Sequence, residues 1–258
     1  MKVLIFPNAE LAVARAAEMI MSQVRARPDA VLGLATGGTM EPVYRAILAG
    51  ASGLSFAGVT TFNLDEYVGL APDHPQSYHR YMQHHLFGHL DIDPAKVHLP
   101  VGNADSPKAE AARYDAAIAA AGGIDLQLLG LGVNGHIGFN EPGSSLGSRT
   151  RIKTLTQKTR ADNARFFGPG EAVPRYAITM GIETIMEARE VVLIATGPHK
   201  AEAVRNMVEG PVSTFCPASM IQFHRHATVI LDEDAATRLQ LRDYYQEVHP
   251  DGAEAQIG

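Results

Sequence analysis

The chain has no tryptophan and a single cysteine, Cys216, among its 258 residues. One thiol cannot form an internal disulfide, which is typical of a reducing compartment, so we expect a cytoplasmic protein. No apolar run is long enough to span a bilayer, and the apolar start of the chain is too short for a signal peptide. Internal repeats and low-complexity tracts are also missing.

Basic residues are outnumbered by acidic ones, since 22 Lys and Arg stand against 28 Asp and Glu, for a net charge of -6. This balance argues against a nucleic-acid partner, which would require a basic surface, and nothing in the chain indicates a membrane partner. The hydrophobic content is ordinary at 46%, enough for one large core. We therefore expect one domain that spans residues 1–258.

Short runs rich in Val, Ile and Leu alternate with stretches of helical periodicity. The predicted strands cover residues 2–6, 30–35, 59–64, 97–99, 125–130, 150–156, 176–180, 191–196 and 228–231, and the main predicted helices cover 9–26, 77–90, 107–121 and 160–167. Such repeated β–α units predict an α/β fold with an open, mostly parallel sheet and helices on both faces. Ligands bind at the carboxyl ends of such strands, so the loops there are expected to hold the site.

Two of these loops carry polar groups but allow more than one interpretation. Gly37, Gly38 and Thr39 stand between a predicted strand and a helix, where backbone N–H groups could bind an anion or simply form a tight turn. Asp65 and Glu66 end the third predicted strand. Adjacent strand side chains point to opposite faces, so both enter one pocket only if the strand ends between them. A carboxylate there suits proton transfer, but it could equally cap a helix.

The loop after residues 125–130 is the most informative. It contains the G-x-G-x-x-G pattern at Gly130, Gly132 and Gly135, yet we reject a dinucleotide site because no helical periodicity follows the third glycine. The loop also carries His136 and Glu141, close enough in sequence for the carboxylate to orient the ring. These residues predict a site for a polar substrate. A histidine pair at helical spacing, His85 and His89, lacks the rest of a metal motif, and we expect no metal site.

Five segments of the chain together resemble the glucosamine-6-phosphate deaminases. The segments are residues 34–39, 62–70, 134–143, 148–156 and 200–204, and the sequence N-G-H-I-G-F-N-E-P-G at 134–143 is the most specific of them. The resemblance covers nearly the whole chain in the right order, and it implies a Rossmann-like fold. It also implies conversion of glucosamine 6-phosphate and water to fructose 6-phosphate and ammonium, in amino-sugar catabolism, without an organic cofactor.

The resemblance also assigns roles to single residues. Asp65 would be the base that moves a proton between C2 and C1 of the opened sugar, and His136 would open the ring with support from Asn134 and Glu141. Many relatives have Asp at the position of Asn134, and an Asn cannot hold a negative charge against the ring. This places more weight on Glu141. The phosphate would be bound by Gly37, Gly38, Thr39, Arg165 and Lys200, with Arg165 in a mobile lid around residues 155–175.

Other functions stay open at this point. They are a deaminase for galactosamine 6-phosphate, a hydrolase like the 6-phosphogluconolactonases, whose loop lacks the continuation at 139–143, and a non-catalytic sugar-phosphate sensor. Some bacterial relatives are hexamers activated by N-acetylglucosamine 6-phosphate. The positions that match their effector site are Ser144, Arg151, Lys153 and Thr154, although two cations on one strand face could instead be a solvated edge.

Overall fold

In the computed structural model, which describes residues 1–164, 167–168 and 170–253, the strands form two sheets. The strands are β1 (Lys2–Phe6), β2 (Val31–Leu34), β3 (Thr60–Asn63), β4 (Asp65–Tyr67), β5 (Val97–His98), β6 (Leu126–Gly130), β7 (Arg151–Thr154), β8 (Tyr176–Thr179), β9 (Glu190–Ala195) and β10 (Ala227–Asp232). Seven of them form a parallel sheet in the order β1-β10-β9-β6-β2-β3-β5. This confirms the predicted mostly parallel sheet.

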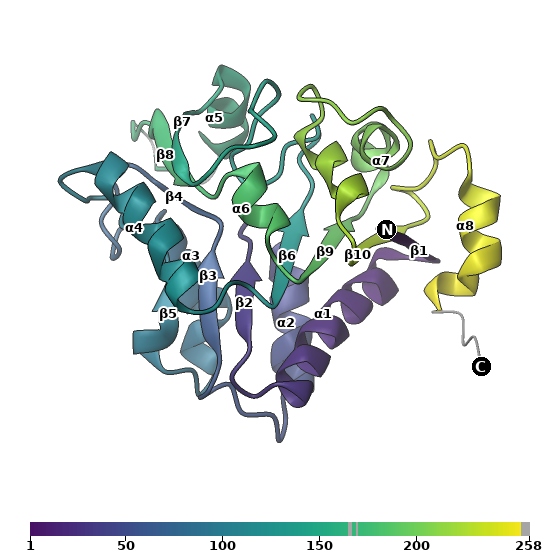
Figure 1. The fold of residues 1–258 in the computed structure, drawn as a ribbon, viewed down its shortest axis with the longest axis horizontal. Helices are drawn as coiled ribbons and strands as arrows, with labels where there is room; N and C mark the ends of the chain where they lie inside the picture. The colour runs from purple at the N-terminus through teal and green to yellow at the C-terminus, as the bar shows by residue number, and fades with distance from the viewer. Residues whose placement is uncertain (165–166, 169, 254–258) are drawn as a thin grey trace.

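Helices cover both faces of the large sheet, as the repeated β–α units predict. The α-helices are α1 (Ala9–Ala26), α2 (Met40–Gly50), α3 (Tyr78–His85), α4 (Pro107–Ala120), α5 (Gln157–Asn163), α6 (Ile182–Met186), α7 (Ala201–Val208) and α8 (Arg242–Val248), and the 3-10 helices include η1 (Phe87–His89), η2 (Pro94–Lys96), η4 (Pro198–Lys200), η5 (Pro217–Phe223) and η6 (Pro250–Gly252). Figure 1 shows α4 and α6 in front of the sheet and α2 behind it.

The first helix illustrates how the sequence sets an element. The Asn8 side chain accepts the backbone N–H of Leu11 at 2.9 Å and so caps α1. Ala12, Ala16 and Ile20 follow at helical spacing and are buried against the core. The central strands β9 and β10 are buried along almost their whole length, which is typical of parallel strands covered on both faces.

A second, smaller sheet was not predicted. Strand β4 pairs antiparallel with β8, and β8 pairs antiparallel with β7. The chain therefore does not leave the sheets at Asp65. It crosses from β3 to β4 through Leu64 alone, whose N–H donates to the Leu34 carbonyl and whose carbonyl accepts the N–H of Met180. Figure 1 shows this small sheet, with α5 beside it, above the carboxyl ends of β2 and β3.

The predicted helix at residues 160–167 starts too late, and its end reaches residues 165–166, which lie outside the described part of the chain. Helix α5 covers Gln157–Asn163 instead, because the Thr156 side chain accepts the backbone N–H of Thr159 and starts the helix earlier. The predicted strand at 150–156 is correspondingly shorter and ends at Thr154. A Thr followed three residues later by another polar residue was the missed signal.

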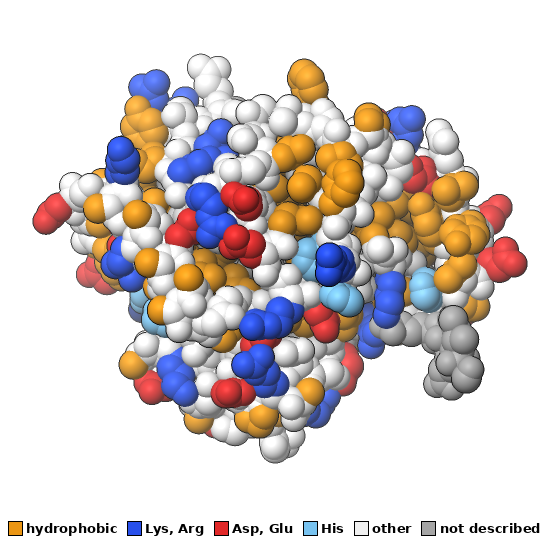
Figure 2. Space-filling view, in the orientation of Figure 1, with side chains coloured by type: hydrophobic (Ala, Val, Ile, Leu, Met, Phe, Trp, Pro, Cys, Tyr) orange, Lys and Arg blue, Asp and Glu red, His pale blue; other side chains and the backbone are white. Residues whose placement is uncertain are grey.

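On the face drawn in Figure 2, basic and acidic side chains lie side by side rather than in a broad basic area. Arg149, for example, pairs with Asp115 at 3.1 Å and with Glu187 at 2.6 Å. Within the described residues, no helix has the length and apolar character needed to cross a membrane.

Candidate active site

A polar cavity of about 390 Å³ opens where the carboxyl ends of β2, β3, β6 and β9 converge. We call it the polar cavity. Its walls collect residues that lie far apart in the sequence. They include Thr36, Gly37, Gly38, Thr39, Leu64, Asp65, Tyr78, Leu131, Gly132, His136, Gly138, Phe139, Thr159, Asn163, His199 and Lys200. The position agrees with the general rule that open parallel sheets bind ligands at this edge.

The glycine loop after β2 forms one wall. Gly37 has a φ of +105°, a conformation that side chains rarely allow, and its carbonyl accepts the N–H of Met40 and the hydroxyl of Tyr81. Helix α2 begins directly after Thr39, whose side chain makes no capping hydrogen bond. Backbone N–H groups at this end of α2 are therefore suited to an anion.

Asp65 forms a second wall and is 5% exposed. Burial, and to a smaller extent the charge of Glu66, raise the pKa of Asp65 to about 8, while the backbone N–H of Phe139 favours the charged form. A side chain at Gly138 would place its Cβ 3.1 Å from Asp65 Oδ2. The glycine thus lets the loop pass directly over the carboxyl group.

Only the first of the two adjacent acids reaches the polar cavity. Glu66 points to the other side of β4 and accepts the backbone N–H groups of Tyr78 and His79 at the start of α3. The helix-cap interpretation left open for Asp65 therefore applies to Glu66. Asp65 is left as a buried acid with an elevated pKa at a cavity wall, which is the arrangement that general bases require.

His136 lies on a third wall as the first member of a hydrogen-bonded chain. Its Nδ1 donates to Asn134 Oδ1 at 2.6 Å, and Asn134 Nδ2 donates to Glu141 Oε2 at 2.8 Å. Glu141 Oε1 in turn accepts the hydroxyl of Thr159 on α5. Because an amide oxygen only accepts, Nδ1 carries the proton of the neutral ring, and Nε2 is the basic nitrogen.

Glu141 does not touch the ring directly. The distance from Glu141 Oε2 to His136 Nδ1 is 3.7 Å, too long for a hydrogen bond. Asn134 bridges the two groups by hydrogen bonds, while the charge of Glu141 acts on the imidazole directly across this distance. Gly132 makes room for the ring, since a Cβ there would lie 2.3 to 2.4 Å from its atoms.

Lys200 completes the cavity on the side of β9. Its Nζ donates to the Leu131 carbonyl at 2.7 Å, which holds the ammonium group next to the loop that carries His136. Burial lowers the pKa of Lys200. His199, which sequence reasoning did not single out, lines the same wall.

Several predicted residues lie elsewhere. Ser144, Arg151, Lys153 and Thr154 do not line the polar cavity. Arg151 and Lys153 are half-buried on one face of β7, while Thr154 is exposed on the other. Arg165 falls outside the described residues. Conversely, Tyr78, Thr159 and Asn163 line the cavity without having been predicted, because no sequence motif marks them.

A second, larger cavity of about 590 Å³ lies behind the glycine loop. Its walls are mixed: the aromatic residues Tyr67, Tyr78, Tyr81 and Phe167 lie beside polar and charged ones such as Glu41, Asp73 and Arg80. It shares Gly37 and the other wall residues Gly38, Tyr78 and Asn163 with the polar cavity, but it contains neither Asp65 nor His136. The larger cavity has titratable side chains of its own, Glu41, Asp73, His84 and His85, but the buried acid with the raised pKa lies in the smaller one.

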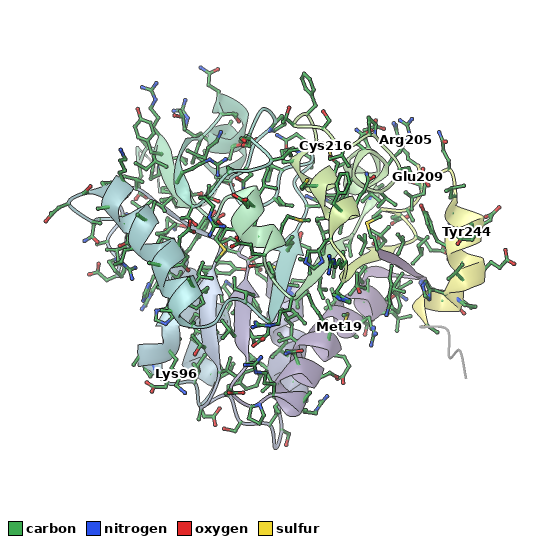
Figure 3. All side chains as sticks on the ribbon, viewed as in Figure 1. Met19, Lys96, Arg205, Glu209, Cys216 and Tyr244 are labelled. Atoms are coloured by element: carbon green, nitrogen blue, oxygen red, sulfur yellow. The ribbon has the colours of Figure 1, made fainter. Side chains whose placement is uncertain are left out.

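Cys216 is buried beside the loop of His136. A Cβ on Gly135 would lie 2.6 Å from the sulfur, and burial raises the pKa of the Cys216 thiol. Figure 3 labels it on the side of the molecule toward which β6 points. The thiol is thus an inert packing group. Among residues 1–164, 167–168 and 170–253, no three His, Cys, Asp or Glu side chains are grouped as metal ligands.

Comparison with known proteins agrees with this geometry. The family model for glucosamine-6-phosphate isomerases and 6-phosphogluconolactonases matches residues 8–230. The chain belongs to this family. A glucosamine-6-phosphate deaminase of Rhodopirellula baltica is 58% identical over 92% of the chain and 96% of its own length, and one of Arthrobacter sp. is 53% identical over 96% of each.

Solved structures of the family resemble the fold to different degrees. One described as a monomeric glucosamine-6-phosphate deaminase has a TM-score of 0.89 at 46% identity and covers 92% of the chain and 100% of its own. The 6-phosphogluconolactonase of Trypanosoma brucei has a TM-score of 0.72 at 19% identity, covering 92% and 98%. The second likeness shows the shared Rossmann-like fold alone.

Proposed function

We propose that this chain is a glucosamine-6-phosphate deaminase, which converts D-glucosamine 6-phosphate and water to D-fructose 6-phosphate and ammonium. The observation that carries the proposal is the polar cavity, where the buried acid Asp65 lines the same space as His136, whose ring is held by hydrogen bonds that run through Asn134 to Glu141. Supporting it are the names and high identities of full-length relatives. The single cysteine suits a cytoplasmic location for amino-sugar catabolism.

The reaction begins with opening of the sugar ring. His136 moves a proton from the C1 hydroxyl to the ring oxygen, and Asn134 holds the imidazole in the tautomer that leaves Nε2 basic. The charge of Glu141, 3.7 Å from Nδ1, stabilises the imidazolium, and Asn134 supplies a neutral hydrogen bond where an Asp would supply a second charge. The product of this step is the open-chain aldehyde.

Proton transfer between carbons follows. Asp65 takes the proton from C2 and returns it to C1, and a proton passes from the C2 amine to the C1 oxygen, so the aldehyde and amine become a C1 hydroxyl and an imine at C2. Water adds to this imine, and ammonia leaves with a proton as ammonium. An acid with a pKa of about 8 is close to neutrality, as a group that both accepts and donates a proton in one cycle requires.

The phosphate occupies the other end of the cavity. Gly37, Gly38 and Thr39 provide backbone N–H groups, and Lys200 provides a point charge held by the Leu131 carbonyl. Arg165 is the proposed second cation. We also propose that residues 155–175 close over the sugar, which is supported by the contribution of Thr159 and Asn163 to the cavity wall.

The decisive experiment measures ammonium and fructose 6-phosphate released by the purified chain from glucosamine 6-phosphate. Galactosamine 6-phosphate and 6-phosphogluconolactone are assayed alongside, and the D65N variant controls for contamination. Release from the gluco substrate alone supports the proposal. Activity on the galacto substrate alone keeps the mechanism and changes the substrate, whereas lactone hydrolysis alone or no turnover at all refutes a deaminase.

We further propose that Ser144, Arg151, Lys153 and Thr154 bind the phosphate of N-acetylglucosamine 6-phosphate as an activator. In the described part of the chain, the Ser144 hydroxyl and Arg151 Nη2 are buried without a hydrogen-bond partner. Thr154 is the residue least suited to this site, because it lies on the face of β7 opposite to Arg151 and Lys153. Arg151 and Asp65 pair with the same residue, Thr179 of β8, which connects the two sites.

Kinetics and assembly test this proposal together. Sigmoidal kinetics that become hyperbolic with N-acetylglucosamine 6-phosphate would support regulation, and hyperbolic kinetics indifferent to it would refute it.

We propose a homo-oligomer, with a hexamer as the form that the resemblance implies. The relative that is 46% identical is described as monomeric, so a monomer measured by light scattering would overturn the hexamer.

A further inference from the structure

Glu66 is a buried carboxylate that the proposed reaction does not use. It is 2% exposed, and the backbone at Gly102 closes over it, since a Cβ there would lie 3.1 Å from Glu66 Cγ. In the described part of the chain, no Lys or Arg pairs with Glu66 or with Asp65. An unpaired acid buried this deeply is costly to ionise, so its surroundings have to compensate.

Backbone N–H groups provide that compensation. Glu66 Oε1 accepts the N–H of Tyr67 at 2.8 Å and that of Tyr78 at 3.0 Å, and Oε2 accepts the N–H of His79 at 3.1 Å. Tyr78 and His79 are the first two residues of α3, after its cap Ser77. One side chain therefore ties strand β4 to the start of a helix.

The two elements tied together both contribute to the wall of the polar cavity. Strand β4 carries Asp65, and α3 carries Tyr78, which lines the same cavity. The ring of Tyr78 stacks on Phe139 at 6.0 Å between centroids, and the N–H of Phe139 is the group that favours ionised Asp65. A shift of α3 would thus change the surroundings of Asp65 in two ways: through β4, to which Glu66 ties α3, and through Phe139, on which Tyr78 stacks.

We propose that Glu66 is a positioning residue for proton transfer: by holding β4 against the first turn of α3, it fixes the positions of Asp65 and Tyr78 in the wall of the polar cavity. Its carboxylate also lies next in sequence to Asp65, so it acts on that group by charge as well as by geometry. This inference rests on the proposed deaminase activity, in which Asp65 is the base.

The electrostatics support the geometry. Burial raises the pKa of Glu66 to about 7, against the effect of its three hydrogen bonds, and the charge of Glu66 in turn raises the pKa of Asp65. Tyr67, Tyr78, His79 and Tyr114 face the pair, and His136 and Lys200 line the same cavity as Asp65; burial raises the pKa of each Tyr and lowers those of His79 and Lys200. The three Tyr and His79 are therefore neutral at pH 7, and the two acids titrate as a coupled pair.

The test compares two substitutions of Glu66 that separate charge from reach. Glu66→Gln keeps the size and removes the charge, so the acidic limb of kcat/KM moves down by about one pH unit as Asp65 ionises more readily. Glu66→Asp keeps the charge but shortens the side chain, so the limb stays and kcat falls about tenfold with little change in KM.

Asp125→Asn is the matched control. Asp125 is likewise a buried carboxylate that accepts a backbone N–H, that of Val31, but it lies at the amino end of the sheet. We expect a lower Tm and an unchanged pH profile. If both Glu66 variants behave like this control, Glu66 is only structural and the proposal is overturned. If Glu66→Gln does not fold, Glu66→Asp decides the test by itself, because an unchanged kcat in Glu66→Asp would refute the positioning role.

A measurement without turnover separates this proposal from the proposed function. The pKa of Asp65 is followed by carbon NMR of its labelled carboxyl group, assigned with D65N, in the wild-type protein and in Glu66→Gln. A fall of about one pH unit supports the coupling even in a protein that releases no ammonium. An unchanged pKa in a folded variant overturns it even if the deaminase activity is established.

Discussion

His136 Nδ1 donates a hydrogen bond of 2.6 Å to the side-chain oxygen of Asn134. The same amide donates to Glu141, so a neutral group stands between an imidazole and a carboxylate. This relay fixes both the tautomer of the ring and the orientation of the amide. It also means that the environment of His136 can be altered by changing one atom of Asn134.

Asn134→Asp tests the relay. The new carboxylate would lie directly against Nδ1 and favour the imidazolium, so we expect the pKa of His136 to rise by about one pH unit. Proton NMR of the histidine ring checks this, with Asn134→Ala as the control that removes the contact without adding charge. A pKa of His136 that is the same in all three proteins would contradict the relay.

Asp65→Asn tests the base. We expect turnover to fall by about 10²–10⁴-fold with KM nearly unchanged, because the carboxyl group acts in proton transfer rather than in binding. In the wild-type protein kcat should rise with pH through about 8, since only ionised Asp65 accepts a proton. Asp73→Asn, which removes an exposed carboxylate from the wall of the other cavity, should leave turnover unchanged.

The substitution Asp65→Asn also has a consequence for stability. The pKa of Asp65 rises on folding from its ordinary 3.8 to about 8, so the folded state holds this proton more tightly than the unfolded state. The stabilisation that protonation gives is complete below pH 3.8 and is lost as pH rises through about 8. At pH 9, D65N should therefore melt at least about 3 °C above the wild type. Thermal unfolding at pH 5 and pH 9 measures this; an equal difference at both values would refute it.

Lys200→Ala tests phosphate binding. Loss of a charge-assisted hydrogen bond should raise KM about 10- to 100-fold, with a smaller effect on kcat. Lys96→Ala is the control for loss of a positive charge, because Lys96 lies just before β5, at the amino end of the sheet, as Figure 3 shows. A fall in kcat without any change in KM would rule out an anchoring role for Lys200.

Gly132→Ala tests the space for the histidine ring. The new Cβ would lie 2.3 to 2.4 Å from ring atoms of His136, so either the ring or the loop must move, and we expect kcat to fall at least about tenfold. Gly147→Ala in the same long loop is the matched control, because no atom lies within 4 Å of its new Cβ. Similar kinetics for the two variants would show that the ring does not depend on this contact.

The sequence predicts the large sheet well because most of its strands are short, mainly apolar runs with clear breaks. Residues 2–6 and 9–26 are correct to within a residue, since Asn8 marks the boundary. The small sheet could not be predicted in this way. Strand β4 has three residues, two of them acidic, and its pairing with β8 joins positions more than 100 residues apart.

The residues of the candidate site likewise fall into those that the sequence predicts and those that it does not. Asp65, His136 and Lys200 could be named because they follow strands and match a family motif. Tyr78 and Thr159 could not, because they enter the cavity from helices whose placement depends on tertiary packing. The different directions of Asp65 and Glu66 were predictable from strand geometry, but the partners of Glu66 were not.

A single residue, Leu64, separates the end of β3 from Asp65, and hydrogen bonds hold its backbone to β2 and to Met180. Any motion that opens or closes the polar cavity must therefore leave the base in place. Helix α5, in contrast, reaches the site through side chains: Thr159 donates to Glu141, and Asn163 donates to the hydroxyl of Tyr67 on β4. The reacting carbons of the sugar would thus meet a base that the backbone holds fixed, and α5 would be the element that encloses them.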